Sequence, residues 1–199
     1  MSYIIRNGQC IFEEGTKIIY YSIRESHRNI ITSLIIPASV ESIYPSAFEG
    51  CLELTSIKVS PDNKVYDSRE DCNAIIDTQS NYLVLGCSST KIPDSVTEIG
   101  DGAFSWSGLT ELVIPDSVTK IGKDAFTGCA ALTKLVIPSS VTTLYGLIIG
   151  GCTGLTELVI PASFREIGRS VFNSWSNSAI IEENGNLKII RTRQQRRGD

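Results

Sequence analysis

The sequence predicts a mainly β fold: a solenoid of stacked coils of about 23 residues, with a parallel sheet on its concave side, one β-hairpin insertion and atypical ends. Composition is the first observation, because Ile, Val and Thr together number 53 residues and Ala only 9. β-branched side chains are stiff at χ1 and fit a pleated sheet better than a helix. The second observation is a fixed period, which is typical of solenoids. The dipeptide Ile-Pro recurs at residues 36–37, 92–93, 114–115, 137–138 and 160–161, the last four at intervals of 22, 23 and 23 residues.

The repeat unit is clearest over residues 109–129, which read L-T-E-L-V-I-P-D-S-V-T-K-I-G-K-D-A-F-T-G-C. Alternate positions of the first, extended part point to one side, and the chain turns at Pro115 and again at Gly128. One coil cannot bury its apolar side alone, so stacked coils should share one continuous core, with neighbouring strands about 4.8 Å apart. The expected inward residues of this coil are Leu109, Leu112, Ile114, Val118, Ile121, Ala125 and Phe126. One expected ladder of like residues is Phe48, Phe104, Phe126 and Phe172.

The period is interrupted once, by an insertion over about residues 60–92. Within it, two apolar runs at residues 73–77 and 82–86 are joined by residues 78–81, which is a β-hairpin pattern. We expect this hairpin to extend one coil of the solenoid rather than to form a second domain.

The two ends of the chain lie outside the regular repeats of residues 31–172. Terminal repeats are usually atypical, because they must cover an open end of the core. Residues 1–30 are therefore predicted to be an N-terminal cap. Its expected short strands are residues 3–6, 9–12 and 17–23.

The C-terminal end is predicted to close with a hairpin in residues 173–190, because Asn184-Gly185 between apolar runs is a strong turn signal. Residues 191–199 are expected to be a loose basic tail. The chain is thus predicted to be a single domain, residues 1–199. The two expected strands of the closing hairpin are residues 179–183 and 186–190.

The motif L-x-x-L-x-I-P-x-S-V-x-x-I-G-x-x-A-F resembles the BspA-like (Treponema pallidum-type) leucine-rich repeats, in five copies between about Ile31 and Phe172. The stretch V-Y-D-S-R-E-x-C-N-A-I-I of the insertion is similar to a segment of the same family. The resemblance implies a leucine-rich-repeat solenoid with a parallel concave sheet. It also implies a non-catalytic protein-interaction module, namely a bacterial surface protein of adhesion or host interaction.

The resemblance and the N-terminal sequence give different predictions of localisation. The resemblance implies a protein that is secreted or at the cell surface. The N-terminus, Met-Ser-Tyr-Ile-Ile-Arg, lacks a charged segment followed by an apolar core, so no signal peptide is predicted. As written, the chain would be cytoplasmic or a fragment of a longer protein.

Charge and hydropathy argue against two classes of partner. Of the net charge of −4, residues 186–199 carry +4 and the remainder carries −8. An acidic body lacks the clustered Lys and Arg that phosphate contacts need, so no nucleic-acid partner is expected. No run approaches 18 apolar residues, so no membrane insertion is expected.

No motif for catalysis, for cofactor binding or for metal ligation is present, so a non-enzyme without a cofactor is predicted. The only histidine, His27, lies in a polar connector and is expected to be solvated. A cluster of acidic residues in the insertion is compatible with calcium, but the EF-hand order is absent and a solvated turn fits better. These acidic residues are Asp62, Asp67, Glu70 and Asp71.

The six cysteines fall into groups with different expectations. Cys51, Cys129 and Cys152 share one repeat position and should form a buried column of structural thiols. Cys72 and Cys87 flank the hairpin strands, and either a disulfide or two reduced thiols would fit there; the lack of an export signal favours reduced thiols.

The candidate binding surface is the outward side of the predicted concave sheet. Alternating charges at Glu111, Lys134 and Glu157 should favour the stacking register, and outward valines should form a narrow apolar strip that can mark a partner site. The expected ligand is a protein or a glycan, and the solenoid is expected to be a monomer. The two outward columns are Ser33, Ser56, Glu111, Lys134 and Glu157, and Ile35, Lys58, Val113, Val136 and Val159. The candidate binding residues are Ser56, Lys58, Glu111, Val113, Lys134, Val136, Glu157 and Val159.

Alternatives to this interpretation stay open. The valines would also be present if β-branched residues simply suited the strands, and the chain would then be a structural spacer or accessory segment of a larger protein. Trp106 and Trp175 lie in turns and are candidate anchors for a partner. The terminal Arg197-Gly198-Asp199 resembles the integrin-recognition tripeptide, but its position at the very end favours a plain tail.

Overall fold

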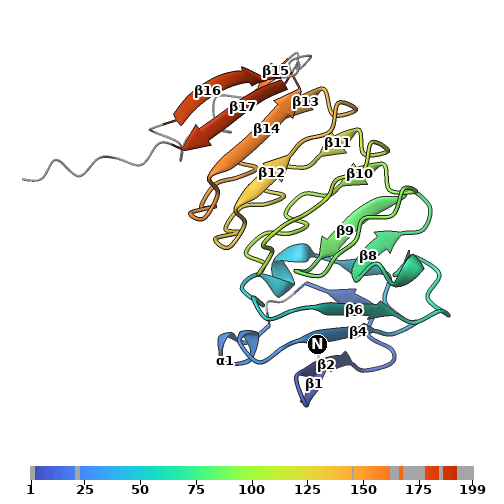
Figure 1. Ribbon diagram of the computed structural model, residues 1–199. Coiled ribbons are helices and arrows are strands. Elements are labelled where there is room, and N and C mark those ends of the chain that lie inside the picture. Colours follow the sequence, from blue (N-terminus) through green and yellow to red (C-terminus); the bar gives the residue numbers. More distant parts are fainter. Residues whose placement is uncertain are drawn as a thin grey trace, which may run out of the picture.

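The computed structural model of the chain describes residues 3–20, 23–144, 146–161, 166–167, 178–183 and 186–191 (Figure 1). Predictions for Phe172, for Trp175, for the turn at Asn184-Gly185 and for the tail from residue 192 fall outside these described residues.

The described chain is a mainly β solenoid, as predicted, and most of its strands fall into two rows (Figure 1). The first row contains the extended segments that precede the Ile-Pro positions: β2 (Gln9–Phe12), β4 (Ser33–Ile36), β6 (Ser56–Val59), β12 (Lys134–Val136) and β14 (Glu157–Pro161). The second row contains the segments that precede the Ile-Gly positions: β3 (Ile18–Ile19), β5 (Ser42–Ile43), β10 (Glu98–Ile99), β11 (Lys120–Ile121), β13 (Thr143–Leu144) and β15 (Glu166–Ile167). The third side of each coil is the turn that contains Ala-Phe, which in one coil is a short 3-10 helix, η1 (Pro45–Phe48).

Neighbouring coils pair in parallel, with equivalent repeat positions side by side. Leu34 lies beside Ile57, and Leu135 lies beside Leu158. The same register includes residues that were predicted to be a cap, because Cys10 of β2 lies beside Leu34 in a parallel pair. The N-terminal segment therefore forms one further coil, and α1 (Glu25–Arg28) connects it to the next.

The outer edge of this first coil is covered by β1 (Tyr3–Arg6), which pairs with β2 in the antiparallel sense. The strands predicted at residues 3–6 and 9–12 are confirmed, whereas in the described residues of the one predicted at 17–23 only the two-residue β3 is a strand.

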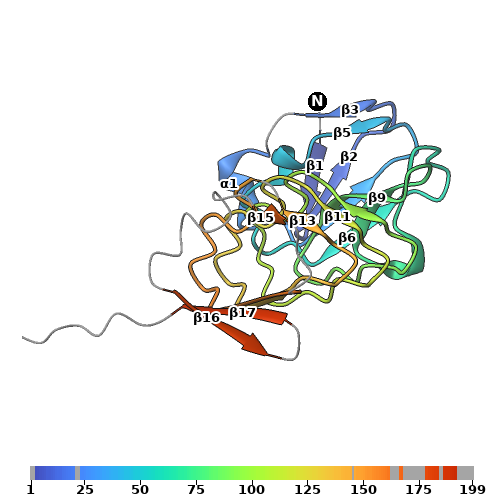
Figure 2. The same ribbon diagram turned by 90° about the horizontal axis from the view of Figure 1, so that it is seen from above.

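The C-terminal hairpin is also confirmed, as β16 (Ser178–Glu183) and β17 (Asn186–Arg191). β17 pairs antiparallel with β14 and buries Ile189 against the core. Seen from above, the coils overlie one another and this hairpin lies along their edge (Figure 2). The closing strand includes Arg191, the first residue of the predicted tail.

The insertion contains the predicted hairpin, β8 (Ala74–Asp77) and β9 (Tyr82–Gly86), which are antiparallel. β9 pairs in parallel with β10, so the hairpin extends the second row. Before it, β7 (Tyr66–Asp67) pairs antiparallel with β8, and η2 (Arg69–Asp71) lies between them in sequence.

The prediction of one continuous core is wrong, because the buried residues form two clusters that meet at this hairpin. Ala74 and Ile76 pack with the C-terminal coils, whereas Ile75, which points the other way, packs with the N-terminal coils. Figure 1 shows β8 and β9 between the two halves. The hairpin therefore acts as a partition, and both of its faces are buried.

At the level of the insertion, two turns of the third side lie in contact, whereas extra strands are added to the second row. The Gly50 amide donates to the Trp106 carbonyl at 3.2 Å, so two turns that are separated by the whole insertion lie against each other. The second row gains the hairpin strands at the same level. As a result the strand direction changes between β4 and β14 (Figure 1).

The phenylalanine column of the third side is regular in the C-terminal half, where the Phe104 and Phe126 rings stack at 5.6 Å between centroids. In the N-terminal half the Phe48 ring instead meets Phe12 of β2, in the first row, edge to face at 6.1 Å. Phe48 and Phe104 belong to different core clusters, so the predicted phenylalanine ladder is divided between them. The Cys129 thiol donates to the Phe104 carbonyl at 3.0 Å. All seven inward residues predicted for the coil of residues 109–129 are buried.

The phenylalanine column gives a test of the core. We expect Phe126→Ala to lower the free energy of unfolding by about 3–5 kcal/mol, because it removes a fully buried ring that stacks on Phe104. Denaturant unfolding followed by circular dichroism measures this. Val113→Ala is the matched control and should change stability by less than about 0.5 kcal/mol, since Val113 is exposed. Equal stability of both variants would contradict the packing described.

Candidate functional site

The candidate site is the outward side of the first row, which we call the first-row face. At its C-terminal end Lys134 of β12 lies beside Glu157 of β14, and Val136 lies beside Val159, as the sequence predicted. At its N-terminal end Ser56 and Lys58 lie on β6, opposite Ser33 and Ile35 of β4. The structure therefore places these candidate residues on one row, in two separate patches.

Of the predicted charge alternation, the pairing of Lys134 with Glu157 is confirmed and that of Lys134 with Glu111 is not. The Lys134 ammonium contacts a Glu157 carboxylate oxygen at 2.7 Å, and Lys188 of β17 approaches the other oxygen at 3.5 Å. The hydrogen bond from Lys134, with the positive charges of both lysines, lowers the pKa of Glu157 below its ordinary value. Within the described residues Glu111 forms no ion pair, although it was predicted to alternate with Lys134.

Between the two patches the first row is irregular. Residues 109–114 were expected to be a strand but have no strand assignment, and neither do residues 88–92 of the preceding coil. Val113 is 85% exposed, the highest value among the large hydrophobic residues that the structure describes. Glu111 and Val113 thus belong to the first-row face without belonging to a sheet.

Sequence reasoning missed three residues of this face. Ser89 and Lys91 occupy the repeat positions of Glu111 and Val113 in the coil that ends at Pro93. Counting back from Ile92-Pro93 would have found them. Lys188 could not be found in this way, because it reaches the face through the closing hairpin, where it lies beside Val159.

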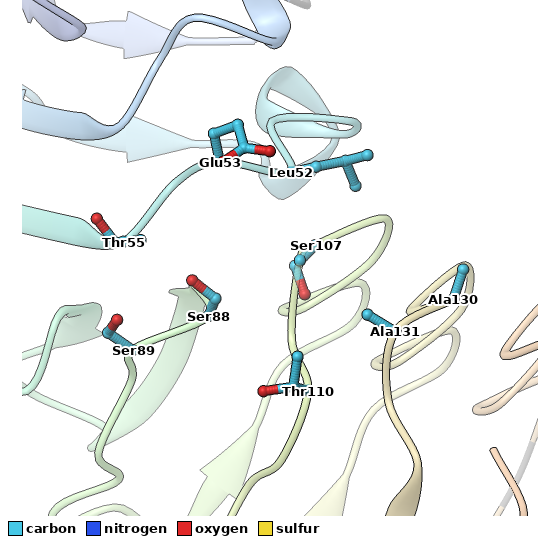
Figure 3. A pocket seen from close by; sticks show the side chains of 10 residues that line it. Leu52, Glu53, Thr55, Ser88, Ser89, Ser107, Thr110, Ala130 and Ala131 are labelled. Carbon is cyan, nitrogen blue, oxygen red and sulfur yellow. The ribbon is translucent and has the colours of Figure 1, made fainter. Parts of the chain in front are cut away.

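The irregular part of the row opens into a cleft of about 550 Å³ (Figure 3). In Figure 3 the chain at Ser88 and Ser89 lies apart from the chain at Ser107 and Thr110. Half of the lining residues bear a hydroxyl, and the others are one glutamate and four small or apolar residues. The lining residues are Leu52, Glu53, Thr55, Ser88, Ser89, Ser107, Gly108, Thr110, Ala130 and Ala131.

Gly108 allows two coils to approach closely beside this cleft. A Cβ on Gly108 would lie 2.0 Å from the Leu52 carbonyl oxygen. Next to it, Trp106 has a φ of 54°, at a turn where Gly50, Gly128 and Gly151 also have positive φ. A non-glycine residue in this conformation is strained. Trp106 is half exposed, as expected for a candidate anchor.

The cysteines are structural. All six are buried, and none of them forms a disulfide, so Cys72 and Cys87 are not joined. Burial raises the pKa of Cys10 to about 12 and the pKa values of Cys51 and Cys72 to about 11. These thiols are therefore protonated at neutral pH, which makes them poor nucleophiles.

The other polar candidates have structural contacts. The His27 ring nitrogen Nδ1 lies 3.1 Å from the Tyr3 hydroxyl in the N-terminal coil. Asp67 accepts hydrogen bonds from the Arg69 guanidinium at 2.7–3.1 Å. Within the described ranges no group of three or more His, Cys, Asp and Glu side chains is placed to hold a metal ion, and no helix there could cross a membrane.

The family model of the BspA type leucine-rich repeat region matches in six copies, over residues 7–72 and 74–194. Among solved structures, the chain is similar to a leucine-rich repeat protein from Eubacterium ventriosum, with a TM-score of 0.55, 24% identity, and coverage of 81% of this chain and 50% of that one. It is also similar to a leucine-rich cell surface protein from Faecalibacterium prausnitzii, with a TM-score of 0.53, 23% identity, and coverage of 81% and 56%.

At these identities the similarity to solved structures concerns the fold, and the chain spans about half the length of each of the two proteins. A search of curated proteins found no match.

Thiol accessibility tests the structural role of the cysteines. In the native protein we expect the six thiols to react with a thiol reagent such as DTNB at a small fraction of the rate of free cysteine, because each is buried. In guanidinium chloride all six should react. Rapid labelling of a native cysteine would contradict the burial described.

The ion pair on the first-row face gives a second test. Lys134→Met should raise the pKa of Glu157 toward its ordinary value, measured by NMR titration of the side-chain carboxyl, because the main hydrogen bond that lowers it is removed. Lys120→Met is the matched control, since Lys120 pairs with Glu98 on the second row.

The stability contribution of Glu157 has a defined pH dependence. Because the folded-state pKa is lowered, the contribution is present above the unfolded-state pKa and is lost as the pH falls through the folded-state pKa. The difference in stability between the wild type and Lys134→Met should therefore shrink in acid. A difference that grows as the pH falls would contradict the pairing.

Proposed function

Because the chain belongs to the BspA-type leucine-rich repeat family, we propose that it binds a partner protein through its first-row face and acts in adhesion at a bacterial cell surface. Leucine-rich repeat proteins are generally non-catalytic binding modules, and the repeat points to protein interaction. The location at a cell surface is supported by the similarity in fold to a leucine-rich cell surface protein of Faecalibacterium prausnitzii.

The observation that carries this proposal is the first-row face itself. On the regular strands β4, β6, β12 and β14 its outward residues are held by a backbone whose register is set by the coils, so they form a preorganised surface. Val113 and Val136 are exposed apolar residues with charged neighbours, a combination that supports a partner site.

The charge of the face supports a protein partner with acidic groups. Although the chain has a net charge of −4, this face carries more positive than negative charge. Such local complementarity speeds encounter and excludes partners of the wrong sign. Its charged residues are Lys58, Lys91, Lys134, Lys188, Glu111 and Glu157.

Adhesion of the purified protein to cultured epithelial cells tests the proposal. The double variant Val113→Asp with Val136→Asp should lower cell-bound protein at least about tenfold, because it places like charge against an acidic partner and removes the apolar contact. Ile18→Asp is the matched control, since Ile18 is a similarly exposed apolar residue on the second row. It should bind as the wild type does.

Thermal unfolding of the variants must accompany this assay, to show that both remain folded. Equal adhesion of the wild type and the double variant would overturn the assignment to the first-row face. No adhesion by the wild type would favour the alternative, a structural spacer of a larger protein.

A further inference from the structure

One backbone interaction recurs along the first row. The carbonyl of Thr32 accepts hydrogen bonds from the amides of Thr55 at 2.9 Å and Ser56 at 3.2 Å. The carbonyl of Thr133 accepts in the same way from Thr156 at 2.9 Å and from Glu157 at 3.3 Å. The residue after each threonine, at the position of Glu111, therefore donates its amide to the previous coil.

This interaction is missing in the coil of Glu111. The equivalent acceptor would be the carbonyl of Ser88, but within the described chain the Glu111 amide has no acceptor. Ser88 itself bonds one residue early, since its amide donates to Leu54 at 3.2 Å rather than to Thr55. The hydrogen-bond register at Ser88, where the insertion ends, is thus shifted by one residue. The coil of Glu111 does not make the corresponding shift.

The opening is confined to the first row. The same two coils are joined on the second row by the Thr119 amide and the Thr97 carbonyl at 2.9 Å, and on the third side by the Phe104 amide and the Ala125 carbonyl at 2.8 Å. Within the described residues the only backbone hydrogen bond of residues 109–114 is the one that the Thr110 carbonyl accepts, at 3.4 Å.

The side chains show the same opening. The inward residues Leu112 and Ile114 are 9% and 8% exposed, whereas the equivalent Leu135 is 0% exposed. Thr110, at the start of the segment, also lines the cleft of Figure 3, so the cleft and the unpaired backbone are continuous. A ladder with unpaired backbone groups is a template for another strand.

We propose that an extended peptide segment of a partner protein adds here as a strand, with its backbone hydrogen-bonded to Glu111 and Val113. This inference rests on the proposed function and specifies the form of the partner. Regularly spaced amides and carbonyls match a peptide backbone better than a sugar, whose hydroxyls have no such spacing. The first residue of the segment would enter the hydroxyl-lined cleft beside Thr110.

The side chains of the row define the chemistry of this peptide. In a strand alternate side chains point outward, so the peptide would place every second residue beside the outward column of the face. In that column Lys58 and Lys91 are exposed and form no ion pair within the described chain, and Val113 lies at the next repeat position. A segment of alternating β-branched and acidic residues therefore fits best.

Synthetic peptides test this directly. The probe is a fluorescent eight-residue peptide of alternating Val and Glu, blocked at both ends, and its binding is measured by fluorescence polarisation. N-methylation of one alternating set of amides should weaken binding at least about tenfold, since it removes the donors that face residues 109–114. Methylation of the other set should not. A counterpart with Lys in place of Glu should bind at least about tenfold more weakly.

Hydrogen exchange locates the contact. In the free protein the amides of Glu111 and Val113 should exchange much faster than those of Ser56 and Glu157, because only the latter pair are hydrogen-bonded. Bound peptide should slow exchange at Glu111 and Val113. The variant Val113→Pro removes one donor without breaking any hydrogen bond within the described protein, so it should stay folded and lose peptide binding.

Each outcome decides between the two proposals. Strand addition is overturned if both N-methylated peptides still bind. It is also overturned if bound peptide leaves hydrogen exchange at Glu111 and Val113 unchanged. Absence of peptide binding, together with cell adhesion that Val113→Asp with Val136→Asp abolishes, overturns strand addition and leaves the first-row face in place. Peptide binding without any adhesion overturns the adhesive role and leaves the strand site.

Discussion

In the regular coils, the stacking of the first row depends on one carbonyl per coil. At the threonine that follows the first aliphatic residue of the repeat, a single carbonyl accepts two backbone amides from the next coil, as at Thr32 and Thr133. The hydroxyls of Thr55 and Thr156 add a third donor to the same carbonyls, at 3.2 and 3.1 Å. Three donors on one oxygen fix the rise and the register of a coil together. The inward columns then pack because their register is already set.

The insertion shows what happens when this interaction is displaced. Ser88 takes the place of the threonine and directs both its amide and its hydroxyl to Leu54, one residue early. The coil is still held, but the next coil meets no carbonyl at the expected place. The core is divided at the same level, because the hairpin β8–β9 buries one face in each half. The cleft, the unpaired backbone and the exposed Val113 are therefore consequences of one shift in register.

Most of the fold could be predicted because the same pattern of inward residues recurs in every coil. The columns of leucine, isoleucine, phenylalanine and cysteine appear in the sequence at a constant interval, and so does Lys134 beside Glu157. The same reasoning failed for Glu111. A repeat pattern predicts which positions are equivalent, but it does not contain the hydrogen-bond geometry between two particular coils. That geometry depends on how the inserted chain returns to the stack at Ser88, and residues 60–87 before it have no repeat from which this could be inferred.

In the described part of the chain, the outward side chains of the first row form no ion pairs between coils other than those of Glu157. Their side chains can change with little cost to the fold, so on the regular strands a partner can be recognised only through side chains. At residues 109–114 the backbone itself is available. Recognition there depends on an extended conformation and on register, and it tolerates variation in the partner's sequence. A face that combines both modes can hold one partner by its shape while its columns of charge and valine select among related sequences.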